Sequence, residues 1–285
     1  MKDLPFTEYF KKEQEEKVAT KVLYRILFVM AAIFLIFFSV NYVFEQKYSY
    51  ITISGRSMQS TLNPSPVYTS ITTDGETTKA WLQDGVYIEE TKNVDYNDII
   101  VINNAAKDKT VIKRALAFGG DYISIVKLQL EDGASEYRFI RVKENTSIVE
   151  VLEEGYVNNH TAWAADLQLP QDVQTPTVVY EPVFYQTFSN NGYDAKLVTL
   201  PKFDLEIKMF KVPEDEVFYM GDNRLFSADA REKGTISNES VRGKVVEIVR
   251  NGSYYKGNDF YFFNRLGGYF RVIWKEILRF FGANV

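Results

Sequence analysis

The pattern of apolar and polar residues begins with a polar tail over residues 1–21 and a long apolar run. Nineteen residues from Ile26 to Phe44 carry no charge. At a rise of 1.5 Å per residue, such a helix is about 29 Å long, close to the thickness of a bilayer's hydrocarbon core. Because the run is apolar on all sides, we predict a transmembrane helix over residues 22–45 rather than a buried core helix.

Charges beside this run predict its orientation in a membrane. Basic residues are frequent before it and sparse within about twenty residues after it: Lys11, Lys12, Lys17, Lys21 and Arg25 precede it, and Lys47 and Arg56 follow. The positive-inside rule therefore places the N-terminus in the cytoplasm and the chain after residue 45 outside the cell membrane. A cleaved signal peptide fits less well, because Glu45, Gln46 and Lys47 follow the run instead of a small-residue cleavage site.

The remaining chain has the short alternating or apolar runs, bounded by Gly, Asn, Asp or Pro, that are typical of β-strands. We therefore predict a mainly β protein. The candidate strands cover residues 50–54, 86–90, 98–103, 111–117, 122–128, 136–142, 177–185, 205–211, 216–220 and 244–249. Residues 63–84 are a turn-rich insertion, and residues 144–176 are irregular and acidic.

The C-terminal tail, residues 256–285, has the period of an amphipathic helix. One stripe is formed by Phe270, Ile273, Trp274, Ile277, Leu278 and Phe281, while Arg271, Lys275, Glu276 and Arg279 lie off it. A basic helix rich in aromatic residues suits a membrane surface, and the alternative is a helix docked on the β domain. We favour the membrane surface because the chain is already anchored there.

Composition excludes several kinds of site. The net charge of −5 argues against a nucleic-acid partner. The chain has no cysteine and a single histidine, His160, which leaves neither a thiol nucleophile nor a Cys- or His-rich metal site, so no cofactor or metal is indicated. His160 lies in a polar loop, where an exposed histidine without a catalytic role is the simpler interpretation.

Candidate chemistry begins at Ser57, which follows a short strand and a glycine, Gly55, that permits a tight turn. A serine hydroxyl needs a base. Lys113 can act as that base if burial lowers its pKa by roughly three units. It is flanked by apolar strand residues and neighbours Arg114, so one of these two side chains can enter the core face while the other stays in water. A dense polar loop after the strand at 216–220 adds Ser227, which could bond to the lysine, and Asp229 and Arg231, which could pair.

Together these stretches resemble the bacterial type I signal peptidase family. The resemblance rests on four segments in order: Ser57-Met58-x-x-Thr61-Leu62, Asn97-Asp98-Ile99-Ile100-Val101, Ile112-Lys113-Arg114 to Gly120-Asp121, and Met220-Gly221-Asp222-Asn223-Arg224 continuing to Ser227, Asp229 and Arg231. It implies a signal-peptidase/LexA-like β catalytic core over residues 46–121 and 216–255. It also implies an inserted β cap over residues 122–215, which is acidic.

The resemblance further implies a mechanism and a substrate. Ser57 would attack the carbonyl of a signal peptide, with neutral Lys113 as base, no cofactor, and cleavage after small residues of Ala-x-Ala type. The Ser57 backbone N–H would bind the oxyanion, while Gly55 stands where some members carry a serine donor. Ser227 would orient Lys113, Asp229 and Arg231 would hold the loop, and pockets for small side chains would be lined by Ile53, Met58 and Ile112.

Four departures from the family pattern and two alternative functions remain. Ser60 stands where the family usually has proline, Phe118-Gly119 replaces a Leu-Pro pair, Asn97 replaces a glycine, and Ala230 replaces a serine. A LexA-like self-cleaving repressor would have a DNA-binding helical domain instead of the apolar run. An inactive or accessory membrane-anchored β module is the alternative function, although such a chain would have no reason to keep Ser57, Lys113 and Ser227 together.

Overall fold

A computed structural model of the chain describes residues 6–59, 61–62, 69–73, 76–80, 84–104, 109–129, 135–157, 179–200, 205–250 and 260–283. Ser60 and His160 lie outside the described residues, so the predictions about them stay open. The chain divides into two compact units, Met1–Tyr48 and Ser49–Val285. The predicted boundary between catalytic core and cap falls inside the second unit and stays a prediction.

The first unit is one helix, α1 (Phe6–Lys47), which contains the apolar run and most of the preceding polar tail. Its segment Lys17–Lys47 is long and apolar enough to cross a membrane. The apolar side chains from Ile26 to Phe38 that carry this character are exposed. The prediction of an N-terminal apolar helix is therefore confirmed, and membrane insertion would bury a surface that is costly to leave in water.

The second unit is mainly β, as predicted. Its first sheet has seven strands in the order β1-β4-β15-β5-β6-β13-β14. Their bounds are β1 Tyr48–Thr52, β4 Gly85–Glu89, β5 Ile99–Asn104, β6 Lys109–Phe118, β13 Glu216–Met220, β14 Ile236–Ser237 and β15 Val241–Val249. This sheet carries the stretches that the sequence singled out for chemistry.

A second sheet is built from the intervening chain. It contains β7 Tyr122–Gln129, β8 Ser135–Val142, β9 Val149–Val151, β10 Val179–Tyr180, β11 Ala195–Leu200 and β12 Leu205–Lys211. In addition, β2 (Thr69–Thr73) and β3 (Glu76–Ala80) form a separate antiparallel pair within the region that the sequence suggested was only a turn-rich insertion.

The predicted strand at residues 177–185 is wrong for most of its length. Within its described residues, 179–185, Val179–Tyr180 forms a strand and helix α2 (Pro182–Asn190) begins directly after Glu181. Glu181 caps this helix, because its carboxylate accepts a hydrogen bond of 2.6 Å from the Phe184 N–H. Proline is favoured in the first helical turn, where its missing N–H costs nothing, so Glu181-Pro182 is a helix-start signal.

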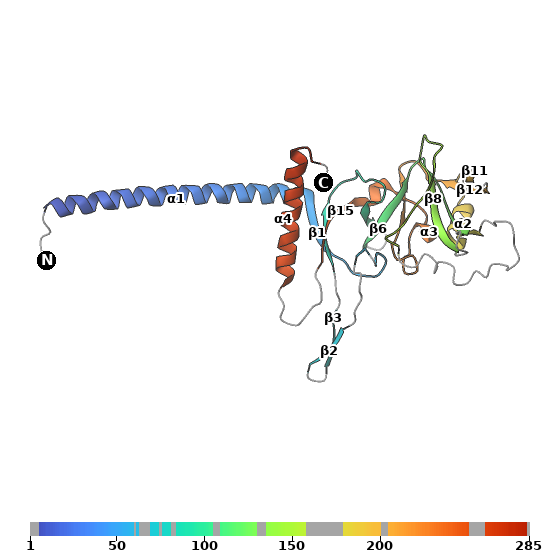
Figure 1. The fold of residues 1–285 in the computed structure, drawn as a ribbon, viewed down its shortest axis with the longest axis horizontal. Helices are drawn as coiled ribbons and strands as arrows, with labels where there is room; N and C mark the ends of the chain where they lie inside the picture. The colour runs from blue at the N-terminus through green and yellow to red at the C-terminus, as the bar shows by residue number, and fades with distance from the viewer. Residues whose placement is uncertain are drawn as a thin grey trace. The chain divides into compact units, whose positions relative to one another are not determined.

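One aromatic core joins the two sheets. Phe139 on β8 stacks on Phe218 on β13 with ring centroids 5.4 Å apart, and the α2 side chains Phe184 and Phe188 pack against Phe218 and Phe210 on β12. Figure 1 shows α2 beside β8 and β12. All five rings are fully buried. The second sheet therefore stabilises the strands of the first directly.

Two short helices, α3 (Ala230–Lys233) and η2 (Asn238–Ser240), lie between β13 and β15. The last element, α4 (Phe260–Phe280), is the predicted C-terminal helix, and it contacts β15 and β4. The helix is therefore docked on the β domain, which is the alternative to the membrane surface that its sequence favours.

Candidate active site

Ser57 lies in a turn that follows β1 and is anchored on both sides. Beneath it, Met58 and Leu62 are buried, and the Leu62 N–H donates to the Met58 carbonyl at 2.7 Å. The Asn223 N–H donates to the Ser57 carbonyl at 3.0 Å. The nucleophile candidate is therefore held by its own turn and by the polar loop that follows β13.

Lys113 projects from β6 to this serine. Its Nζ lies 2.7 Å from Ser57 Oγ and 3.0 Å from the Ile112 carbonyl oxygen, and the residue is only 4% exposed. Burial lowers the pKa of Lys113 to about 8, although Asp229 and Asp222 nearby oppose the shift. A neutral amine at hydrogen-bond distance can accept the serine proton, so the pair has the geometry of a nucleophile and its base.

We expect Lys113→Met to stabilise the protein at neutral pH. Because the folded pKa of about 8 lies below the ordinary value of 10.5, the unfolded chain binds more protons between these pH values, and wild-type stability rises with pH there. Below pH 8 Lys113 is charged in both the folded and the unfolded state, and the shift in its pKa lowers the free energy of unfolding by about 3 kcal/mol. Chemical unfolding of the full chain in detergent should show an advantage for the variant at pH 7 that disappears near pH 10.5. An equal difference at both pH values would contradict it.

The predicted substrate residues lie together beside the serine and lysine. Ile53, Met58 and Ile112 line a cleft of about 230 Å³ whose walls also include Ser57 and Lys113. One wall is the end of β1 and the other is the start of β6. The pairing of β13 with β6 reaches only to Arg114, so within the described residues the preceding part of β6 has β5 as its partner strand on one side only. An extended peptide could bond to that free side.

Gly55 has a backbone that favours glycine. Its φ is +101°, and a Cβ there would meet nothing within 4 Å. The cost of another residue at this position would therefore come from backbone strain and not from crowding. A serine at position 55 would carry that strain, so glycine, which offers only its backbone N–H as a donor, suits this position.

The loop after β13 approaches the serine closely at Gly221. A Cβ on Gly221 would lie 2.4 Å from the Ser57 carbonyl oxygen and 2.3 Å from Ser227 Oγ, so only glycine fits. Ser227 Oγ is buried and contributes to the lowered pKa of the Asp229 carboxylate, and within the described residues it makes no hydrogen bond to Lys113. The bonds that orient Lys113 go to Ser57 and Ile112 instead, so the predicted role of Ser227 in orienting the lysine stays without a supporting contact.

Asp229 and Arg231 form a buried pair in the same loop. Arg231 Nε donates to Asp229 Oδ1 at 2.9 Å, and the Gly221 N–H donates to Asp229 Oδ2 at 3.0 Å. Burial alone would raise the pKa of Asp229, but the charge and hydrogen bonds of Arg231 hold it below its usual value. The carboxylate also caps α3 by accepting from the Arg231 N–H. This pair therefore fixes the position of Gly221 against Ser57.

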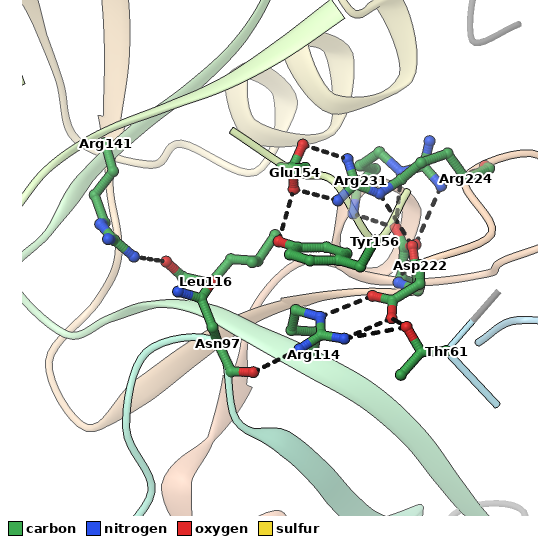
Figure 2. Close-up of polar contacts among 12 residues, drawn as sticks. Thr61, Asn97, Arg114, Leu116, Arg141, Glu154, Tyr156, Asp222, Arg224 and Arg231 are labelled. Carbon is green, nitrogen blue, oxygen red and sulfur yellow. Dashed lines mark hydrogen bonds and ion pairs between the residues drawn. The ribbon is translucent and has the colours of Figure 1, made fainter. Parts of the chain in front are cut away.

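Arg114 is buried, which corrects the expectation that one of the Lys113–Arg114 pair stays in water. Its side chain is on the opposite strand face from Lys113, where Nε and Nη2 donate to Asp222 at 2.9 and 2.6 Å and Nη1 donates to the Asn97 carbonyl at 2.7 Å. Asp222 also accepts from the Thr61 hydroxyl (Figure 2). Through these bonds the Asp222 carboxylate, in the loop after β13, connects to β6, which carries Lys113, and to the turn that contains Ser57.

Comparison with known proteins decides the family. A family profile described as "Signal peptidase, peptidase S26" matches residues 22–250. The chain belongs to this signal peptidase family. A search of curated proteins finds no match. Among solved structures, a signal peptidase I from Enterococcus faecalis V583 is 18% identical, with a TM-score of 0.28, over 54% of this chain and 97% of that one.

Two functional candidates of this S26 chain, Glu154 and Tyr156, were not found from the sequence. Both lie in the irregular acidic stretch after β9, yet Glu154 forms a bidentate ion pair with Arg224 of the β13 loop, with a distance of 2.9 Å between Oε2 and Nη1. Tyr156 donates to Glu154 at 3.1 Å, and its ring lies 4.0 Å from the Arg114 guanidinium carbon (Figure 2). The one sign of this contact in the sequence is Arg224 itself, because a buried arginine needs a partner of opposite charge.

The acidic side chains near the cleft, within the residue ranges that the structure describes, pair with basic ones. Within those ranges, no group of three or more His, Asp or Glu side chains is arranged to hold a metal ion. The carboxylates near the cleft, Asp222 and Asp229, are each engaged by an arginine. Their arrangement suits charge compensation in a buried loop.

Proposed function

We propose that this chain is a membrane-anchored serine endopeptidase that removes signal peptides from exported preproteins by a Ser-Lys mechanism. The observation that carries the proposal is the 2.7 Å contact between Ser57 Oγ and the buried Lys113 Nζ at the edge of a cleft. Membership of the S26 signal peptidase family supports the reaction class.

In the proposed reaction Ser57 Oγ attacks the scissile carbonyl while neutral Lys113 takes its proton. The Ser57 backbone N–H stabilises the oxyanion. Lys113 then donates the proton to the leaving amine, which frees the mature protein, and water activated by the same lysine hydrolyses the acyl-enzyme. Asp222 and Asp229 keep the loop charges compensated throughout.

The proposed substrate binds in extended form between the end of β1 and the start of β6. Ile53, Met58 and Ile112 would then contact the side chains at −1 and −3 of the cleavage site. The cleft of about 230 Å³ is small, and these three side chains form an apolar part of its otherwise mixed lining. This favours alanine and similar small residues at both positions.

The proposed location is the bacterial plasma membrane, with α1 crossing it once. The excess of basic residues before the apolar run supports a cytoplasmic N-terminus and an extracytoplasmic Ser49–Val285 unit. In this orientation the cleft would lie on the side where exported preproteins emerge.

The test is cleavage of a purified preprotein that ends its signal peptide in Ala-x-Ala, using the full chain in detergent. We expect one cut directly after the −1 alanine, located by mass spectrometry. A matched preprotein with Phe at −1 should be cut on the order of 10²-fold more slowly, because the pocket is too small for the ring. Equal cleavage of both substrates, or none of either, would contradict the proposal.

A further inference from the structure

Helix α4 packs on the β domain with the face opposite to its apolar stripe. The contact face contains Gly268, where a Cβ would lie 2.6 Å from Val249 and 2.9 Å from Tyr87, and Val272, which is 2% exposed. Lys275 on the same face donates to the Val246 carbonyl at 2.9 Å and to Glu247 at 2.8 Å. The helix is therefore held by a close backbone approach and by charge.

The exposed face of α4 is its most apolar one. It is formed by large side chains with high exposed fractions: Phe262 64%, Phe263 64%, Phe270 54%, Trp274 60%, Ile277 41%, Phe280 85% and Phe281 77%. A helix that only covered a sheet would turn such a stripe inward. Contiguous exposed apolar surface of this kind marks an interaction site.

Charged residues of α4 do not interrupt this surface. Arg271 and Lys275 are engaged with Glu247 on β15, and Arg279 pairs with Glu276 at 2.6 Å. The basic residues that suggested a membrane surface in the sequence thus serve to dock the helix and to pair within it. The outward face can leave water without desolvating a charge.

Chain connectivity places this face near a membrane if α1 spans one. The Arg265 guanidinium carbon lies 4.6 Å from the ring centroid of Tyr50 on β1. Tyr50 is three residues after the end of α1 at Lys47, and three residues reach at most about 11 Å. The start of α4 is therefore close to the point where the chain would leave the bilayer.

We propose that the exposed aromatic face of α4 inserts into the interfacial layer of the same bilayer that α1 crosses. Phe and Trp side chains suit this layer, and a docked helix would hold the cleft at a fixed height above the lipid. The proposal rests on the membrane anchoring given under the proposed function. Because apolar burial drives the insertion, it should occur on zwitterionic lipid and persist at high salt.

The chain has no cysteine, so one introduced cysteine can carry a single polarity-sensitive fluorophore. We would label Phe270→Cys and Ile277→Cys in the full chain, reconstituted in phosphatidylcholine vesicles with quenchers on the acyl chains. The matched control is Leu197→Cys on β11, which is 65% exposed, and the reference for membrane insertion is Phe34→Cys, also 65% exposed, in α1. We expect several-fold stronger quenching at 270 and 277 than at 197.

Quenching at Phe34→Cys without quenching at 270 and 277 would overturn this inference and leave the anchored peptidase standing. A blue-shifted emission at 270 that lipid quenchers do not reach would also overturn it, since the face would then be covered by protein, such as a second copy of the chain. A fluorophore at position 34 that is itself unquenched would instead contradict the anchoring on which the proposal rests.

A second readout concerns the role of the face in processing. The triple variant Phe270→Ser, Trp274→Ser, Phe281→Ser changes only exposed side chains. We expect it to lose several-fold in cleavage of a membrane-inserted preprotein while keeping wild-type cleavage of a short soluble peptide in detergent. An equal loss on both substrates would indicate a structural role only and would overturn the positioning claim.

Discussion

Replacing Lys113 or Ser57 with alanine should abolish preprotein cleavage, with a loss in kcat/KM of at least about 10³-fold. Neither change should unfold the protein, because Lys113 opposes folding at neutral pH and Ser57 is at the edge of the cleft. The measurement is cleavage of an Ala-x-Ala preprotein in detergent, with thermal unfolding as the check on folding. Lys211→Ala, which removes a surface lysine paired with Glu214, is the matched control and should retain full activity.

The pH profile distinguishes a base from a structural lysine. Since the amine must be neutral to accept a proton, kcat/KM should be level above about pH 8 and fall tenfold per pH unit below it. Lys113→Arg should be inactive at every pH, because a guanidinium keeps its charge and cannot act as the base. Near-wild-type processing by Lys113→Ala, or a profile without a limb near pH 8, would rule out the mechanism.

Sequence reasoning was most successful where the chemistry is local. The local pattern made Ser57 and Lys113 candidates, and the resemblance to the signal peptidase family paired them as nucleophile and base. The structure places Ser57 Oγ and Lys113 Nζ 2.7 Å apart. The apolar run predicted α1 in the same way. These features depend on the residue itself and its immediate neighbours, so a linear pattern contains them.

Contacts between residues that are far apart in the sequence could not be predicted from such patterns. Arg114 and Asp222 are 108 residues apart, and nothing near Arg114 shows that a carboxylate will make its burial favourable. For α4 the apolar period correctly predicted a helix. Which face of the helix contacts the β domain depends on the fit of Gly268 against Tyr87 and on the ion pair with Glu247 of β15, and the sequence of the helix alone does not contain these partners. For α2, the apolar run hid a helix whose start signal, Glu181-Pro182, is two residues long.

Glu154→Ala should destabilise the protein by about 3–5 kcal/mol, because it removes one partner of a buried ion pair. Arg224 is 3% exposed and Glu154 is 1% exposed, so the guanidinium cannot reach water to replace the lost carboxylate. Chemical unfolding of the full chain in detergent measures the loss. Glu90→Ala provides the control, since its pair with Arg242 is about one-third exposed on both sides and should be worth no more than about 1 kcal/mol.

The same substitution should lower kcat, although Glu154 belongs to the second sheet's segment and lies away from the cleft lining. Arg224 Nε donates to the Gly221 carbonyl at 3.0 Å, and Gly221 is the residue that fits against the Ser57 carbonyl. Loss of the carboxylate would loosen this loop and with it the nucleophile. If the stability is lost because the Arg224 charge is left without a partner, the double variant Glu154→Leu, Arg224→Leu should recover most of it. The double variant should not recover the activity, because the Gly221 carbonyl still lacks the hydrogen bond from Arg224. Recovery of both would show that Arg224 has no positioning role, and failure to recover stability would show that packing, not charge, holds this segment against the β13 loop.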